Sequence, residues 1–213
     1  MNSGIITPNG ARKIMGRDNF HGCEVFDFFG AKLPPEGTAN LSQTTVLENE
    51  LERDKENCVL VLIPPISIRK MLDSPRLDDL RLAEFFDRDE NWPEDNPCLN
   101  RRGSEWTWCF VRKTPVPDSN EKPWREQLAL LGKNDEVPFV RELVYAIIAH
   151  YVQTSERLFE SDYVRCLEPL SDKVIYVGFP KSGIHLRERD GDFSHPTIGL
   201  ASVRRITPSN IVL

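Results

Sequence analysis

The sequence contains few of the residues that most enzymes use for chemistry. Its 213 residues include 4 histidines, 3 methionines and 5 cysteines. No pair of cysteines has the C-x-x-C spacing; they are Cys23, Cys58, Cys98, Cys109 and Cys166. A chain of this length can build a core without disulfides, and an odd number of unpaired cysteines is typical of reduced thiols. We therefore expect a cytoplasmic protein whose thiols are mostly reduced.

Several motifs that mark common enzyme classes are absent. There is no G-x-x-x-x-G-K-[ST] phosphate-binding loop, no G-x-G-x-x-G dinucleotide fingerprint and no G-x-S-x-G nucleophile motif. These patterns position phosphates or a serine nucleophile by backbone geometry. We therefore do not expect a nucleotide-binding enzyme of the usual kinds, and the sequence indicates neither a cofactor nor a metal.

Long apolar runs and an excess of basic residues are also missing. Residues 1–13 lack the apolar stretch of a signal peptide, and charged side chains interrupt the apolar run in residues 138–159. The 27 basic and 33 acidic residues give a net charge of −6, which does not favour nucleic acid as a partner. The basic pairs 101–102 and 204–205 are isolated. We therefore expect neither a membrane nor a nucleic acid as partner. The partner is unknown, and a protein is the class that these observations leave open.

The strongest pattern that is present covers residues 138–159. Apolar side chains recur there with the spacing of a helix and share one face, whereas Glu142 and Gln153 lie opposite. Pro138 suits the first turn, where no backbone donor is needed. His150 lies at the margin of the apolar face. The pattern predicts a long amphipathic helix whose apolar stripe is covered by a sheet.

Shorter patterns predict strands and further helices. Residues 119–131 predict a helix directly before the long one, and residues 76–87 have apolar side chains at near-helical spacing. Strands are predicted at residues 23–29, 58–63, 105–113, 163–167, 173–179 and 184–189, with a strand or helical turn at 200–206. The fold class is therefore α+β, with a mostly antiparallel sheet packed against two sequential helices, the longer one at about 138–159.

Composition also suggests a domain organisation. Residues 1–22 contain four glycines together with asparagine and proline, which favours a flexible N-terminal arm. Residues 23–213 then form a single α+β domain. The prolines and glycine of residues 90–103 make that stretch the best position for an internal boundary.

Short runs in the second half of the chain are similar to a recurring pattern in uncharacterised bacterial proteins. The runs are KTPV from residue 113, WREQ from 124, ERLF from 156, YVR from 163 and GLASVR from 199. In that pattern a glycine precedes the Glu-Arg pair, where this chain has Ser155. The resemblance covers about residues 113–205 and implies no activity, ligand or catalytic residue.

The densest polar cluster lies in residues 185–195, HLRERDGDFSH. It brings together His185, His195, Asp190 and Asp192, and a carboxylate with an imidazole is what metal-assisted hydrolysis uses. The spacing matches no metal motif, and Asp-Gly-Asp is first of all a turn signal. The segment predicts a turn with solvated charges, and a hydrolase site, with or without a metal, is the alternative.

Three residues of the strand at 105–113 form a candidate binding face. Trp106, Trp108 and Arg112 fall on the same side of that strand. Aromatic rings beside a cation can stack on unpaired bases, although such rings are more commonly core. The leading hypothesis is a small cytoplasmic binding or interaction module without chemistry of its own. The alternatives are a hydrolase using residues 185–195 and a single-stranded nucleic-acid binder using this strand face.

Overall fold

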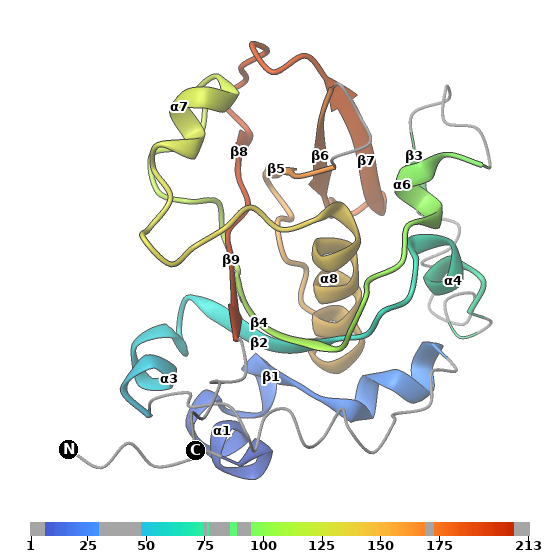
Figure 1. Ribbon diagram of the computed structural model, residues 1–213, viewed down its shortest axis with the longest axis vertical. Helices are drawn as coiled ribbons and strands as arrows, with labels where there is room; N and C mark the ends of the chain where they lie inside the picture. Colours follow the sequence, from blue (N-terminus) through green and yellow to red (C-terminus); the bar gives the residue numbers. More distant parts are fainter. Residues whose placement is uncertain are drawn as a thin grey trace.

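Helix α8, Val140–Thr154, lies in the middle of the computed structural model and contacts both of its sheets (Figure 1). The structure describes residues 7–29, 48–74, 76, 86–88, 95–168 and 173–206. From its first residue to His150 the helix is buried on every side. The sequence predicted one apolar stripe and a solvated opposite face, and that is wrong because sheets cover both faces of the helix.

The ends of α8 differ from the predicted range of 138–159. The helix begins at Val140, and the carboxylate of Glu142 accepts the backbone N–H of Phe139 at 2.9 Å, which closes its first turn. It ends at Thr154 because Ser155 adopts a left-handed conformation, with φ of 62°. A glycine takes this conformation more readily than a serine does.

One sheet covers one side of α8. In order across the sheet its strands are β1 (Phe20–His21), β2 (Cys58–Ile63), β4 (Thr107–Arg112) and β9 (Val203–Ile206). β1 is parallel to β2, and the other pairs are antiparallel. The predicted strands at 58–63 and 105–113 are confirmed within a few residues, and of the two alternatives for 200–206 the structure has the strand, over Val203–Ile206. The apolar run of β2 is buried almost throughout, as its lack of alternation indicated.

The second sheet lies near the other end of the molecule (Figure 1). Its strands in order are β3 (Phe86–Arg88), β7 (Ile184–Arg189), β6 (Val174–Gly178), β5 (Tyr163–Cys166) and β8 (Ile198–Leu200). The antiparallel meander of β5, β6 and β7 confirms the three strands predicted after the long helix. β3 and β8 add parallel partners at the two edges. The α+β class is therefore confirmed, with two sheets in place of one.

The other helices are short. Helix α7, Trp124–Leu128, replaces the longer helix predicted at 119–131. Between the strands lie α3 (Glu48–Asp54), α4 (Ile68–Leu72) and α6 (Pro97–Asn100). α6 occupies the stretch where a boundary was predicted, and it contacts both α4 and α8.

The N-terminal segment is structured where the sequence predicted a flexible arm. Residues 7–22 contain α1 (Pro8–Met15), the 3-10 turn η1 (Arg17–Asn19) and β1. Thr7 caps α1, and its hydroxyl accepts the N–H of Gly10 at 3.2 Å. The following segment η2 (Cys23–Phe29) is a 3-10 helix, so the strand predicted at 23–29 is wrong.

Some predictions fall outside the described residues. These are the first six residues of the arm, most of the helix predicted at 76–87, and part of the boundary at 90–103. Among the described helices, none is long and apolar enough to cross a bilayer.

Candidate anion-binding site

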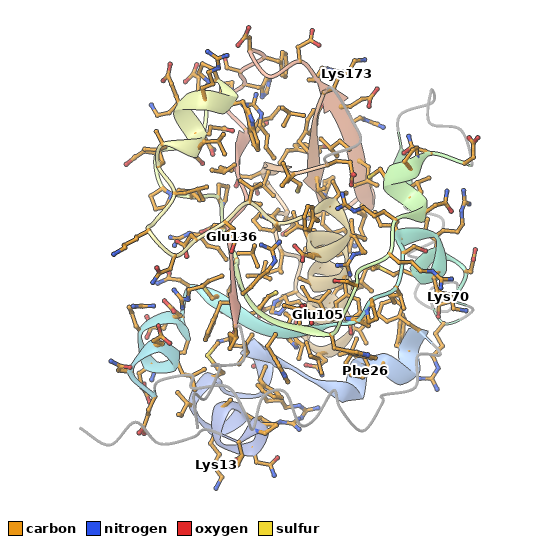
Figure 2. All side chains as sticks on the ribbon, viewed as in Figure 1. Lys13, Phe26, Lys70, Glu105, Glu136 and Lys173 are labelled. Carbon is orange, nitrogen blue, oxygen red and sulfur yellow. The ribbon has the colours of Figure 1, made fainter. Side chains whose placement is uncertain are left out.

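A cavity of about 330 Å³ opens beside the first turn of α8. Its walls come from three separate parts of the chain: residues 101–108, which lead into β4; residues 139–142, where α8 begins; and residues 205–206 of β9. Glu105, labelled in Figure 2, marks the first of these walls. Four of the lining side chains are arginines and two are glutamates, so the cavity is cationic although the chain as a whole is acidic.

Arg141 is the most deeply buried of these arginines, with 8% of its surface exposed. Within the described chain its guanidinium donates one hydrogen bond, 2.8 Å long, to the carbonyl oxygen of Pro64. The nearest carboxylate oxygen, from Glu142, is 3.8 Å from Nη2, which is beyond hydrogen-bonding distance. Burial lowers the pKa of Arg141, yet a guanidinium stays protonated at neutral pH. The cavity therefore contains a buried positive charge with donors left over.

Gly103 leaves the room that this guanidinium needs. A Cβ atom at position 103 would lie 2.7 Å from Nη2 of Arg141 and 2.9 Å from Cζ. Contacts of that length do not occur between a carbon and a neighbouring side chain without displacement. The glycine thus allows the backbone of residues 101–108 to pass directly over Arg141.

Glu142 is already committed to other partners. Its two carboxylate oxygens accept Nη2 and Nε of Arg205 at 2.7 and 3.3 Å, a two-point pairing. One of them also accepts the backbone N–H of Phe139. Arg205 bonds in addition to Glu136, which is labelled in Figure 2. Since Glu142 neutralises Arg205, it does little to satisfy Arg141.

Two guanidinium groups pack against the ring of Phe139. Cζ of Arg101 lies 4.6 Å from the ring centroid, and Cζ of Arg205 lies 5.2 Å from it. Arg101 also donates to the buried carboxylate of Glu168 at 3.1 Å. Three guanidiniums are therefore held near the positive end of α8. Two of them have a carboxylate partner, while no carboxylate of a described residue lies within 3.5 Å of Arg141.

Comparison with known proteins gives no guide to the use of this cavity. No family model, no curated protein and no solved structure matches the chain.

The histidines predicted from the 185–195 segment line a second cavity, of about 430 Å³, on the sheet of β5, β6 and β7. His185 and His195 both contribute to it. Asp190 and Asp192 are not among its lining residues. The carbonyl of Asp190 accepts the N–H of Phe193 at 3.1 Å, which confirms the predicted turn. Across the described ranges, no three potential metal ligands of the His, Cys, Asp or Glu type gather in one place.

His185 has two partners that the sequence did not reveal. Its Nδ1 lies 2.9 Å from the hydroxyl of Tyr163, and its Nε2 lies 3.0 Å from the hydroxyl of Ser182. The contact to Ser182 forms in the turn between β6 and β7, three residues away in sequence. Cys58, Cys98, Cys109 and Cys166 are not alternative nucleophiles, because burial raises the pKa of all four thiols, that of Cys58 to about 11.

The face that carries Trp106, Trp108 and Arg112, along β4 and the residue before it, is mostly inside the protein. Trp108 is 4% exposed and its ring packs on Phe20, with centroids 5.2 Å apart. Trp106 is partly buried with its edge against Phe26, at 4.5 Å. Arg112 is half-buried, and its Nε has no hydrogen-bond partner among the described residues. The ring of Trp108 thus presents no free face for stacking on a base.

Sequence reasoning missed the arginine cavity. The pairs 101–102 and 204–205 are isolated in the sequence, yet the fold brings the guanidiniums of Arg101 and Arg205 to 4.6 and 5.2 Å from the centroid of the Phe139 ring. The sequence feature that could have indicated this cavity is the charged pair Arg141-Glu142, immediately before the apolar run of α8. Two charges in an otherwise apolar helix indicate a buried polar site when the helix is covered on all sides.

Proposed function

We propose that the protein is a non-catalytic binding module that holds a small oxyanion, a carboxylate or a phosphate, in the arginine cavity. The observation that carries the proposal is the buried guanidinium of Arg141, which has a single carbonyl partner among the described residues. A buried charge without a close counter-ion is costly, and a bound anion would remove that cost. Guanidinium groups also match the geometry of carboxylate and phosphate oxygens.

The surroundings of the cavity support the same ligand class. A volume of about 330 Å³ is within the range of small-molecule sites. The backbone at the start of a long helix adds a favourable field for negative charge. Free thiols at Cys58, Cys98, Cys109 and Cys166 are consistent with a reducing compartment, and we propose the cytoplasm as the place of action.

Calorimetric titration with inorganic phosphate and with citrate tests the proposal. We expect at least one of these anions to bind wild-type protein, and Arg141→Gln to weaken that binding at least about tenfold, because a charge-assisted pair worth about 1.5–3 kcal/mol is lost. Arg125→Gln is the matched control, since Arg125 is exposed on α7 and is not part of the cavity lining. It should bind as wild type does.

A second arginine variant keeps the test valid if Arg141→Gln fails to fold. Arg102→Gln changes an exposed side chain of the same cavity, so it should fold normally and still bind the anion more weakly. Equal binding by the wild-type protein and both cavity variants would contradict the proposal, as would no binding of either anion at about 10 mM.

The hydrogen-bond chain from Ser182 through His185 to Tyr163 favours a hydrolase as the second candidate. In that arrangement Nε2 of His185 can accept the proton of the serine hydroxyl while the tyrosine orients Nδ1. We expect a sulfonyl fluoride to modify Ser182, and peptide mass spectrometry to find this adduct missing from the His185→Ala variant. Labelling that is unchanged in that variant, or an unmodified Ser182, excludes this candidate.

A further inference from the structure

The backbone at Gly103 covers one flat face of the Arg141 guanidinium. A Cβ atom at position 103 would lie 2.7 Å from Nη2 of Arg141, 2.9 Å from Cζ and 3.2 Å from Nη1. That position is above the plane of the group, because a point in the plane beyond the two terminal nitrogens would be farther from Cζ than from either of them. A ligand therefore reaches this arginine along its edge, where the N–H groups point.

The edge of the Arg141 guanidinium suits a flat anion. Nη1 donates to the carbonyl oxygen of Pro64 at 2.8 Å, but each terminal nitrogen has two N–H groups, so a pair of donors is left for a ligand. A carboxylate that accepts two parallel N–H groups lies in the plane of the guanidinium. A phosphate is tetrahedral, so some of its oxygens project out of that plane, where the backbone of residue 103 passes. The geometry thus favours a carboxylate over a phosphate.

The carboxylate of Glu142 limits the ligand to one negative charge. It is paired with Arg205 at 2.7 Å, and its other oxygen lies 3.8 Å from Nη2 of Arg141. Arg102 and Glu105 are both exposed in the wall of the cavity, and their opposite charges offset each other. A second carboxylate on the ligand would lose part of its hydration and would be repelled by Glu142.

The cavity is larger than a carboxylate group, and part of its lining is apolar. At about 30 Å³ for a water-sized group, 330 Å³ holds about ten such groups, of which a carboxylate fills about three. Three half-buried apolar side chains line the cavity: Trp106, Phe139 and Ile206. Apolar surface that remains in contact with water favours an apolar ligand. The part of the ligand beyond its carboxylate is therefore uncharged and apolar.

We propose that the arginine cavity binds a monocarboxylate with an apolar chain, of the short fatty acid class, in preference to phosphate or a dicarboxylate. This inference rests on the proposed function and narrows it to one class of ligand. The carboxylate accepts N–H groups at the edge of Arg141, and the chain lies against the apolar part of the lining. Each CH₂ group of the chain that leaves water raises the affinity about twofold to fourfold.

Calorimetric titration with acetate, hexanoate and adipate tests this inference on the wild-type protein. Hexanoate and adipate have the same number of carbons, and adipate has a second carboxylate in place of the terminal methyl group. Hexanoate should bind about tenfold more tightly than acetate, or better, because its chain leaves water. It should also bind about tenfold more tightly than adipate, or better, because Glu142 repels the second carboxylate. Arg141→Gln should weaken hexanoate binding about tenfold.

Ile206→Thr tests the apolar part of the lining without changing any charge. It should lower the affinity for hexanoate about threefold and leave the affinity for acetate unchanged, because acetate has no chain that could lose a contact. Ile14→Thr is the matched control, since Ile14 is a half-buried isoleucine on α1 outside the cavity lining. It should bind both anions as wild type does.

The outcomes separate this inference from the proposed function. Adipate or phosphate that binds as tightly as hexanoate, and more weakly in Arg141→Gln, overturns the inference and leaves the proposed function standing. Hexanoate affinity that is unchanged in Arg141→Gln also overturns the inference, because the ligand then binds elsewhere. If hexanoate, phosphate and citrate all fail to bind at about 10 mM, the inference and the proposed function are both wrong.

Discussion

Replacing Glu142 with glutamine should destabilise the protein by about 3 kcal/mol. Removing one member of a buried ion pair costs about 3–5 kcal/mol, because the remaining charge stays buried. The Glu142 side chain is 4% exposed and pairs with Arg205 at 2.7 Å. We expect the lower end of the range because Arg205 is 19% exposed and keeps its bond to Glu136. The midpoint of urea unfolding measures the change.

Glu136→Gln is the matched control for this prediction. It removes a carboxylate from the same arginine, but the Glu136 side chain is 61% exposed, and exposed pairs contribute about 0–1 kcal/mol. The two variants should therefore differ by about 2 kcal/mol or more. Glu142→Gln should also bind the anion more tightly, because the cavity then holds one negative charge fewer. Equal stability losses in both variants would show that Glu142 has no special structural role.

Acid should destabilise the protein between pH 6.5 and pH 4 through His150. Burial, assisted by the charge of Lys113, lowers the pKa of His150 from 6.5 to about 4, although Asp18 acts in the opposite direction. The unfolded chain therefore binds a proton in this range that the folded protein does not. Stability is full above about pH 6.5 and falls as the pH approaches 4, by about 2 kcal/mol between pH 6.5 and 5.

The geometry around His150 agrees with a neutral ring. Its Nδ1 lies 3.0 Å from Nε2 of His21, and both side chains are almost fully buried. His21 also bonds to Gln153, so one proton shared between the imidazoles joins the N-terminal segment to α8. Glu156 lies 3.6 Å from Nε2 of His150, but its side chain is 77% exposed and would give a charged ring little support.

Urea unfolding at several pH values tests this effect. In His150→Gln the loss of stability between pH 6.5 and 5 should be absent, because the buried titrating group has been removed. His195→Gln is the control, since His195 is exposed, and it should retain the wild-type profile. A wild-type profile in His150→Gln would show that another group causes the acid sensitivity.

Much of the framework was predictable from local patterns. The run CVLVLI at 58–63 is a strand because it is apolar and bounded by proline, and the meander at 163–189 follows from alternation and turn residues. Local signals failed where tertiary contacts decide. Glycine and asparagine in residues 1–22 suggested an arm, yet Ala11 and Met15 are buried and β1 pairs with β2. Residues 23–29 alternate like a strand but form a 3-10 helix.

The candidate sites were less predictable because their residues are distant in sequence. His185 and His195 line one cavity, and their closeness in the sequence, on either side of a single turn, is the feature that points to it. Arg101, Arg141 and Arg205 meet only after β4, α8 and β9 have assembled, and no spacing within one segment reports that meeting.

Crystals grown with selenate test the arginine cavity most directly, because the anomalous scattering of selenium locates the anion without assumptions about its partners. We expect a selenate peak within hydrogen-bonding distance of the Arg141 guanidinium in wild-type protein, and no peak there in Arg141→Gln crystals. A wild-type cavity that contains only water at selenate concentrations of about 50 mM, while selenate binds elsewhere on the surface, would contradict this expectation.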